Sequence, residues 1–166
     1  MSKILELREK RAKAWEAAKA FLDSNIDFKI IRTAAVMGKG GTFFDWLLNT
    51  MKKEKTVALY DNIYFSPTPL SLLNQSIAAI INNYDSIQQK ILHIVGEKRL
   101  SRYQFALMVK QYINCECLII KEKTTNKTLL FQKDLSLLPS DIINKWKNKN
   151  FEDYIKDEIK NAAFCE

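Results

Sequence analysis

A short apolar run at residues 28–37 constrains the fold of this 166-residue chain more than any other feature. The run contains isoleucine and valine, as expected of a β-strand that is buried on both faces. A glycine turn from Gly38 to Gly41 ends the run, and Thr42 then offers a side chain that can cap a following helix. A strand followed directly by a turn and a helix is the unit from which α/β folds are built.

The same alternation continues towards the C-terminus. Further strands are expected at 56–60, 91–95 and 117–121, each a short apolar segment. The segment Ser66-Pro67-Thr68-Pro69 predicts a rigid bend, because two prolines fix φ and exclude helix there. The expected helices start at Thr42, Ser71, Ser101, Pro139 and Phe151, and the last of them ends at Ala163. Strands that alternate with helices indicate the α/β class.

Residues 3–23 are expected to form one further helix ahead of the alternating region. The segment is rich in Ala, Lys, Glu and Leu and contains no Gly or Pro. Its apolar residues fall near one face, so we expect an amphipathic helix that packs this face against the strand at 30–36. Replacing Trp15 with alanine would then cost about 3–5 kcal/mol, as for other buried large-to-small changes. The residues of this face are Leu5, Ala12, Trp15, Ala18 and Leu22.

The number and spacing of the glycines determine which kinds of phosphate-binding loop the chain can form. The four glycines are Gly38, Gly40, Gly41 and Gly96. A dinucleotide-binding fingerprint needs three correctly spaced glycines between a first strand and its helix, because the backbone there approaches the pyrophosphate. The turn at 38–41 has a different spacing, and it also lacks the Gly-Lys-Ser/Thr end of a P-loop. The sequence therefore predicts that this chain alone binds neither NADPH nor NADH.

The net charge and the types of basic residue limit the classes of partner that this chain can bind. The formal net charge is +7, but the 26 basic residues include only five arginines. Nucleic-acid surfaces favour arginine, which contacts phosphate and guanine bidentately. Because the lysines are also scattered, we expect no nucleic-acid partner and favour a solvated basic surface, with a specific polyanion site as the alternative.

No segment predicts a secreted or membrane protein. The charged N-terminus has no apolar core of a signal peptide, and no apolar run reaches the roughly 18–20 residues of a membrane span. Cys115, Cys117 and Cys165 form no C-x-x-C motif, and with His93 as the one histidine they make no four-ligand zinc set. We therefore expect a cytoplasmic protein with free thiols and no metal.

Four segments, in this order and spacing, resemble one enzyme family. They are similar to the second half of the dTDP-4-dehydrorhamnose reductases, a branch of the extended short-chain dehydrogenase/reductases, over residues 25–164. The resemblance implies a partial Rossmann-type fold that lacks the N-terminal cofactor-binding half. The segments are Ile31-Arg32-Thr33-Ala34-Ala35-Val36-Met37-Gly38, Gly40-Gly41-Thr42-Phe43, Ser66-Pro67-Thr68-Pro69 and Gly96-Glu97-Lys98-Arg99-Leu100-Ser101-Arg102-Tyr103.

The resemblance also implies which chemistry is missing. In the family the cofactor loop and a catalytic Tyr-x-x-x-Lys pair lie upstream of the Arg-Thr strand, and the lysine lowers the tyrosine pKa. Counting back from Arg32 places that pair near Lys10 and Ala14, and the first tyrosine of the chain is Tyr60. No catalytic residue is therefore expected, and NAD(P)H-dependent reduction would need a partner that supplies the missing half.

Several matched positions depart from the family pattern. Thr42 stands where the family usually has asparagine, and 62–68 corresponds to a segment commonly written Asp-Gln-x-x-Ser-Pro-Thr. The segment 100–106 is close to the family's Ser-x-Tyr-Glu-Phe-Ala helix start, whereas 132–137 lacks the arginine and proline of the late Arg-Pro-x-x-Ser-Leu segment. These departures bear on the sugar-nucleotide pocket rather than on the fold.

The resemblance implies a set of substrate-binding residues at the matched positions. Arg102 and Tyr103, at a helix N-terminus, suit an anionic ligand, whereas Arg32 either binds phosphate or pairs with a neighbouring segment. The aromatics at 43, 44 and 46 are expected in the core rather than as a base-stacking platform, and His93 as a satisfied core histidine. The implied set is Arg32, Thr33, Thr42, Phe43, Ser66, Thr68, Arg102 and Tyr103.

The first 24 residues weakly resemble the leader helix of tailed-phage major capsid proteins, which divides the chain into 1–24 and 25–166. Two functions remain open. One is a truncated or split sugar-nucleotide reductase half that binds a dTDP-sugar. The other is a non-enzymatic protein-interaction module, phage-related or not, that reuses the fold. In the parent fold further strands flank the strand at 28–37, so its bare edge predicts a homo-oligomer or a partner chain.

Overall fold

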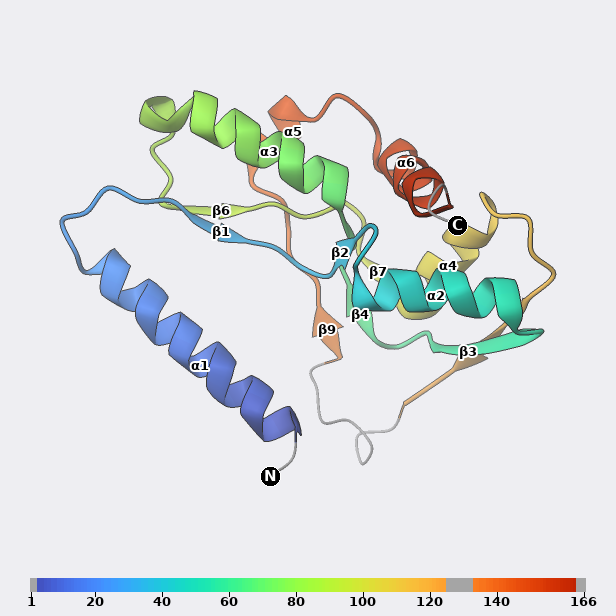
Figure 1. Cartoon of the computed structure of the whole chain (residues 1–166). Helices are drawn as coiled ribbons and strands as arrows, with labels where there is room; N and C mark the ends of the chain where they lie inside the picture. Colours follow the sequence, from blue (N-terminus) through green and yellow to red (C-terminus); the bar gives the residue numbers. More distant parts are fainter. Residues whose placement is uncertain (1–2, 125–132, 164–166) are drawn as a thin grey trace.

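The computed structural model describes residues 3–124 and 133–163, in which helices and strands alternate as expected (Figure 1). Cys165, Gln132 and, apart from Thr124, the polar loop predicted at 124–127 lie outside the described residues. The helices are α1 (Lys3–Leu22), α2 (Thr42–Lys53), α3 (Leu70–Asn82), α4 (Arg102–Lys110), α5 (Asp141–Trp146) and α6 (Phe151–Ala163), with a 3-10 turn at Tyr84–Ser86.

The strands are short and form small ladders. Three ladders are parallel pairs, β1 with β6, β2 with β5 and β3 with β8. In the fourth, β4 lies between β7, which is antiparallel to it, and β9, which is parallel. The strands are β1 (Ile30–Arg32), β2 (Val36–Met37), β3 (Thr56–Tyr60), β4 (Tyr64–Phe65), β5 (Thr68–Pro69), β6 (Ile91–His93), β7 (Leu100–Ser101), β8 (Leu118–Glu122) and β9 (Asp134–Leu135).

The expectation of one strand at 28–37, buried on both faces, is wrong. The chain first pairs with β6 through β1 and then changes partner, pairing with β5 through β2. The change of partner breaks the run into two strands of three and two residues. Burial is also incomplete, because Ile31 in the middle of β1 is 37% exposed.

The main core lies between α2, α4 and α6 and the β3–β8 ladder. Phe44 and Phe105 are fully buried at its centre, where α2 and α4 meet. A second cluster lies under α3 and α5 and is built on Leu92 of β6. Burial of this kind is the main favourable contribution to folding. The other members of the main core include Leu47, Met51, Val57, Leu59, Val109 and Ile155.

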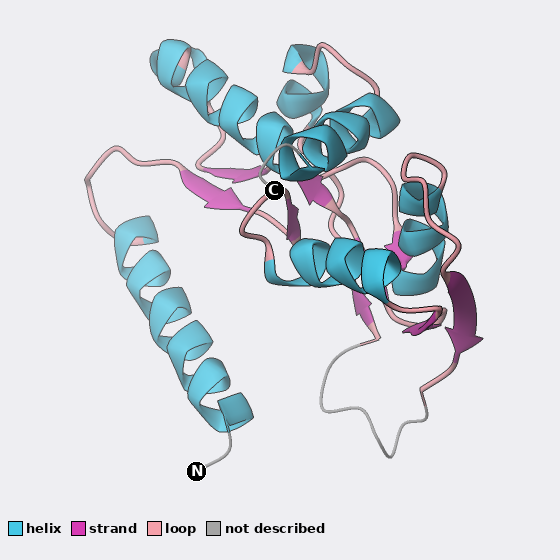
Figure 2. Ribbon diagram, turned by 45° about the vertical axis from the view of Figure 1, so that its right-hand side comes forward, coloured by secondary structure: helices cyan, strands magenta, loops and turns pink. Residues whose placement is uncertain are grey.

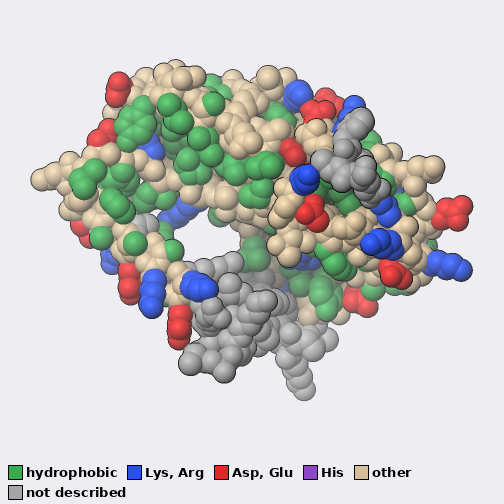
Figure 3. Space-filling view, in the orientation of Figure 1, with side chains coloured by type: hydrophobic (Ala, Val, Ile, Leu, Met, Phe, Trp, Pro, Cys, Tyr) green, Lys and Arg blue, Asp and Glu red, His purple; other side chains and the backbone are tan. Residues whose placement is uncertain are grey.

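Helix α1 lies apart from these cores, and open space separates much of it from the rest (Figures 2 and 3). Every side chain of α1 whose burial is described is exposed, and Trp15 and Phe21 are 51% and 50% exposed. The expected burial is therefore wrong for Ala12 and Trp15, the members of this face whose burial the structure describes. Charged side chains surround the helix and leave too narrow an apolar stripe to pack. They include Glu9, Lys10, Lys13, Glu16 and Lys19.

Two further expectations concern membranes and metals. Within residues 3–124 and 133–163, no helix has both the length and the apolar character needed to cross a bilayer. In the same residues no group of three His, Cys, Asp or Glu side chains is arranged to hold a metal ion. Cys115 is half-buried and Cys117 is buried, and both are free thiols.

Candidate functional site

The N-terminus of α2 follows a tight glycine turn. The Gly41 N–H donates to the Gly38 carbonyl at 2.9 Å, and Gly40 adopts φ +87°, which favours glycine. The Gly40 N–H donates to the Asp45 carboxylate at 2.8 Å. Thr42 was expected to cap this helix, but Gly41 is the cap residue and no side chain hydrogen-bonds to the first turn. The partial positive charge of the α2 N-terminus is instead countered by the Asp45 carboxylate in the first turn.

The N-terminus of α4 is capped as the sequence predicts. The Gln104 N–H donates to Ser101 Oγ at 3.1 Å, and the Ser101 N–H donates to Gln104 Oε1 at 2.8 Å. This reciprocal pair is a capping box. The Arg102 N–H donates to the Ile63 carbonyl at 3.3 Å, which fixes the first residue of α4 beside the chain that enters β4.

The guanidinium of Arg102 is the most informative group of this region. Its Cζ atom lies 4.4 Å from the ring centroid of Phe43 and 5.7 Å from that of Phe65. Burial lowers the pKa of Arg102 from its ordinary value. In the part of the chain that the structure describes, this guanidinium makes contacts with rings and has no hydrogen bond or ion pair. A half-buried cation without a counter-ion suits an anionic ligand.

The aromatic side chains of α2 differ in burial. Phe44 is fully buried, as expected of a core residue. Phe43 is half-buried and packs against Phe65 and Phe105, with ring centroids 6.0 and 6.2 Å away. Trp46 is 46% exposed, so its assignment to the core is wrong. Its ring stacks on Phe43 at a centroid distance of 5.9 Å and an interplanar angle of 27°.

Tyr103 lies on a neighbouring charged surface. Its ring centroid is 5.7 Å from Lys121 Nζ, which forms an ion pair with Asp61 at 2.9 Å. Close by, the Arg99 guanidinium stacks 3.6 Å from the Tyr64 ring centroid and pairs with a carboxylate of β9. Arg99 and Lys121 are thus neutralised by partners within the chain, whereas Arg102 is not.

The remaining members of the predicted set lie elsewhere. Ser66 is buried, where its Oγ donates to the Leu137 carbonyl at 2.8 Å and accepts from the Leu137 N–H at 3.1 Å. Thr68 is fully buried in β5, and its Oγ1 donates to the Ser66 carbonyl at 3.4 Å. Arg32 stacks over the Trp15 ring at 4.8 Å, and Thr33 beside it is exposed.

The predicted set therefore divides into three groups. Thr42, Phe43, Arg102 and Tyr103 come from the first turns of α2 and α4, which meet at the Phe43–Arg102 contact. Ser66 and Thr68 stabilise the proline bend inside the fold. Arg32 and Thr33 lie at the carboxyl end of β1, towards α1. That these residues bind a substrate remains a prediction, for which the first group has the most suitable geometry.

His93 is satisfied as expected, although it is half-buried rather than in the core. Its Nδ1–H donates to the Leu138 carbonyl at 3.2 Å. Its backbone N–H donates to Ser140 Oγ at 2.9 Å. These contacts attach the loop before α5 to the end of β6, which is a structural role.

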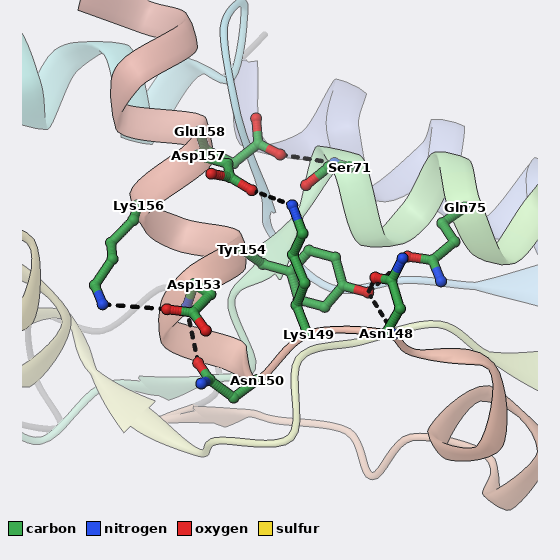
Figure 4. Close-up of polar contacts among 10 residues, drawn as sticks. All are labelled: Ser71, Gln75, Asn148, Lys149, Asn150, Asp153, Tyr154, Lys156, Asp157 and Glu158. Carbon is green, nitrogen blue, oxygen red and sulfur yellow. Dashed lines mark hydrogen bonds and ion pairs between the residues drawn. The ribbon is translucent and has the colours of Figure 1, made fainter.

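Sequence reasoning did not identify a buried polar cluster between α3 and α6 (Figure 4). Glu158 is 2% exposed, and its Oε1 accepts a hydrogen bond from the Ser71 N–H at 2.7 Å. In the same cluster the Tyr154 hydroxyl donates to Gln75 Oε1 at 2.6 Å. Glu158 thus caps the N-terminus of α3 from another helix. The available signal was a glutamate on the apolar face of 151–163.

This cluster also tests whether the glycine turn fits a dinucleotide. A Cβ added to Gly38 would lie 2.7 Å from Leu70 Cβ and 2.9 Å from Glu158 Oε2. The space beside Gly38 is therefore filled by protein, and a carboxylate faces it. Because a pyrophosphate needs open backbone and positive potential, the residues of this turn do not fit an NADP pyrophosphate.

An open hollow lies elsewhere, where β3 and β8 begin. It has a volume of about 630 Å³ and is lined by residues 51–55 and 114–117. Lys53 and Lys55 are interleaved with Glu54 and Glu116, so the charge there is mixed. Mixed charge does not favour the polyanion site left open by the sequence.

A family profile described as the RmlD substrate binding domain matches residues 11–128, which is most of the chain. A search of curated protein sequences found no significant match. The family match begins inside α1, and the capsid resemblance of the first 24 residues finds no support in these comparisons.

Solved structures of similar fold are sugar-nucleotide enzymes. A dTDP-4-dehydrorhamnose reductase from Bacillus anthracis, in complex with NADP, superposes with a TM-score of 0.75 at 17% identity, covering 90% of this chain and 53% of that one. The reductase from Yersinia enterocolitica gives 0.66 at 15% identity, covering 80% and 49%. A hypothetical reductase from Sulfolobus tokodaii gives 0.57 at 26% identity, covering 75% and 45%.

The chain thus has a mixed α/β fold that matches part of the extended short-chain dehydrogenase/reductase structures and spans about half the length of these relatives. The matched part is the substrate-binding region. The partial Rossmann-type fold expected from the sequence is confirmed at this level.

Proposed function

This chain belongs to the RmlD substrate-binding domain family, and from that premise we propose that it binds a dTDP-sugar as the substrate-side half of a sugar-nucleotide reductase. Reduction itself would need a partner that supplies the cofactor site and the Tyr-x-x-x-Lys pair. The observation that carries the proposal is Arg102, a half-buried guanidinium without an anionic partner among the described residues. It lies where the first turns of α2 and α4 meet.

The ligand chemistry follows from these groups. A sugar nucleotide carries a diphosphate, and the first turn of α2 has N–H groups without a side-chain cap, beside the Asp45 carboxylate. Arg102 adds a planar guanidinium that can contact two phosphate oxygens at once. Thr42 and Tyr103 offer hydroxyl groups on the same two helix starts for the sugar. No step of chemistry is assigned to these residues, which bind and orient.

Titration with dTDP tests this proposal, with calorimetry as the readout. The wild-type chain should bind dTDP, and Arg102→Gln should weaken binding by about 10- to 100-fold, as expected for the loss of a charge-assisted hydrogen bond of ~1.5–3 kcal/mol. Arg99→Gln is the matched control, because Arg99 already pairs with Asp134. Equal losses in the two variants, or no binding by the wild-type chain, would contradict the proposal.

The same proposal predicts the behaviour towards the cofactor. Since the space beside Gly38 in the glycine turn is filled by Leu70 and Glu158, the chain alone should not bind NADPH and should not reduce a dTDP-4-keto sugar. Fluorescence titration of NADPH measures this directly. Micromolar affinity for NADPH would overturn the assignment of this chain to the substrate side alone.

A partner chain is the second part of the proposal. Apolar side chains gather over α3 in the space-filling view (Figure 3), where Ile81 is 67% exposed, and Ile31 of the nearby β1 is 37% exposed. In the described residues β1 pairs on one edge, with β6. A bare strand edge beside exposed apolar side chains favours association with another chain.

A non-enzymatic interaction module is the second candidate function, and this apolar surface is the observation that favours it. Light scattering at high concentration should show a homo-oligomer, and Ile81→Glu should disperse it. Leu107→Glu on α4, where Leu107 is 40% exposed, is the control and should leave assembly unchanged. A compact monomer would contradict self-association. Stable assembly without dTDP affinity would favour the interaction module over the reductase half.

A further inference from the structure

Trp46 differs from the other aromatic side chains of α2 because much of its ring faces solvent. It is 46% exposed, whereas the Phe43 ring on which it stacks is seated on Phe65 and Phe105. A large exposed ring that is held in place by a rigid neighbour has lost little freedom and can accept a second flat ring at small entropic cost.

The surroundings of Trp46 are polar rather than apolar. On a helix, side chains three and four positions away share a face, so Thr42 and Asn49 flank the indole. Both are exposed. One aromatic ring between a hydroxyl and an amide is too small an apolar area for a protein interface, but it matches the flat face and polar edge of a nucleobase.

The ring is also close to the anion-binding groups. Phe43 contacts Trp46 on α2 and the Arg102 guanidinium on α4, so the three side chains form one continuous row. A nucleotide combines a flat base with a diphosphate in one molecule. The row offers a ring for the base and a guanidinium for the diphosphate.

We propose that Trp46 is the stacking surface for the base of the nucleotide whose diphosphate lies against Arg102, so that Trp46 is a specificity-determining residue of this site. The inference rests on the proposed binding of a sugar nucleotide and adds to it the position of the base. Asn49 then faces the edge of the base, where its amide can distinguish thymine from other bases by hydrogen bonding.

Three probes separate the parts of this site, namely dTDP, thymidine and inorganic pyrophosphate. In the full chain, dTDP and thymidine should quench tryptophan emission, and pyrophosphate should bind without quenching. Trp46→Leu should weaken dTDP binding about tenfold or more, in line with measured stacking energies of ~1–3 kcal/mol per base, and should leave the Kd of pyrophosphate unchanged. Trp46→Phe, which keeps an aromatic ring, should recover part of the affinity for dTDP.

Trp15 supplies a matched control because it is 51% exposed and lies on α1. Trp15→Leu should leave dTDP affinity and quenching unchanged. If dTDP binds in an Arg102-dependent manner while Trp46→Leu changes neither Kd nor quenching, the inference about the base is wrong and the proposed function stands. If neither dTDP nor pyrophosphate binds to the wild-type chain, both are wrong. A melting temperature of Trp46→Leu equal to that of the wild type shows that the variant is folded.

Discussion

The α2–α4 region and the α1–β1 region belong to one chain but are packed very differently. In the first, Phe44 and Phe105 are fully buried between helices and a parallel ladder. In the second, Trp15 is about half exposed, and the ring contacts of α1 among the described residues are Trp15 with Arg32 and Phe21 with Phe28. The two regions differ in how many neighbouring elements they pack against. Helix α2 has α4, α6 and β3 around it, whereas β1 has one partner strand in the described residues.

This comparison shows that apolar residues at helical spacing predict a helix but not its burial. A buried side chain needs a second surface, and most hydrophobic stabilisation comes from that contact. The α2–α4 region contains its second surface within the chain and should be independently stable. The α1–β1 region should gain stability only from a partner.

The largest expected loss of stability lies at the centre of the α2–α4 region. Phe105→Ala removes a ring that is 0% exposed and contacts Phe43, Phe44 and Phe65. The free energy of unfolding should fall by about 3–5 kcal/mol, because the change leaves a cavity. Urea unfolding followed by circular dichroism measures it. Leu107→Ala on the same helix, at a site 40% exposed, should cost less than about 1 kcal/mol; equal costs would mean that the region is not a fixed core.

The next largest effect is expected from a substitution that adds atoms to a packed position rather than removing a contact. In Gly96→Ala the new methyl group would lie 2.5 Å from a Phe151 ring carbon and closer still to the Pro67 carbonyl oxygen. Overpacking of this kind should cost about 1–3 kcal/mol, measured as a shift in the urea midpoint. Gly40→Ala is the comparison, since nothing lies within 4 Å of its added Cβ and its φ of +87° is the source of strain. That strain should cost about 1 kcal/mol. A Gly96→Ala variant as stable as the wild type would show that Gly96 is not packed against Pro67 and Phe151.

A smaller loss of stability is expected in the α1–β1 region. Trp15→Ala should lower the free energy of unfolding by no more than about 1 kcal/mol, because the side chain loses one contact with Arg32 that is partly in water. Removal of residues 1–24 should leave the melting temperature of the remainder within a few degrees of the full chain. A loss of about 3 kcal/mol or more for Trp15→Ala would show that α1 packs tightly in solution and would remove the contrast between the two regions.

The features that could be predicted from the sequence are those that local residues decide. Ser101 caps α4 as expected, through a capping box with Gln104, and α6 spans Phe151–Ala163 as predicted. The strand predicted at 56–60 is also present, and in the structure its residues alternate between the core and solvent. In each case the deciding residues lie within a few positions of one another.

The features that could not be predicted depend on residues far apart in the chain. The division of 28–37 into β1 and β2 follows from pairing with β6 and β5. Glu158 caps α3 across 87 positions. The exposure of Trp46 depends on which face of α2 the helices α4 and α6 cover. At the site, the sequence supplied Arg102 and Phe43 but could not show that they touch, and it grouped them with Ser66 and Thr68, which are buried in the bend.

The smallest expected effect is a pH dependence at the margin of the packed region. Hydrogen bonds from the Ser136 hydroxyl and N–H, and then from Arg99, lower the pKa of Asp134 from 3.8 to about 2. Because the folded-state pKa is below the unfolded value, the carboxylate contributes stability that is present above about pH 4 and is lost as the pH falls towards 2. Asp134 is 47% exposed, so solvent screening keeps this contribution within the ~0–1 kcal/mol of surface ion pairs.

Asp134→Asn should therefore be slightly less stable than the wild type at pH 6, and the difference should vanish near pH 2, as measured by urea midpoints. Asp85→Asn, a substitution in the exposed 3-10 turn, is the control. A stability difference for Asp134→Asn that is the same at pH 6 and pH 2 would mean that Arg99 and Ser136 do not hold β9 through this carboxylate, and that β9 belongs with the open region rather than the packed one.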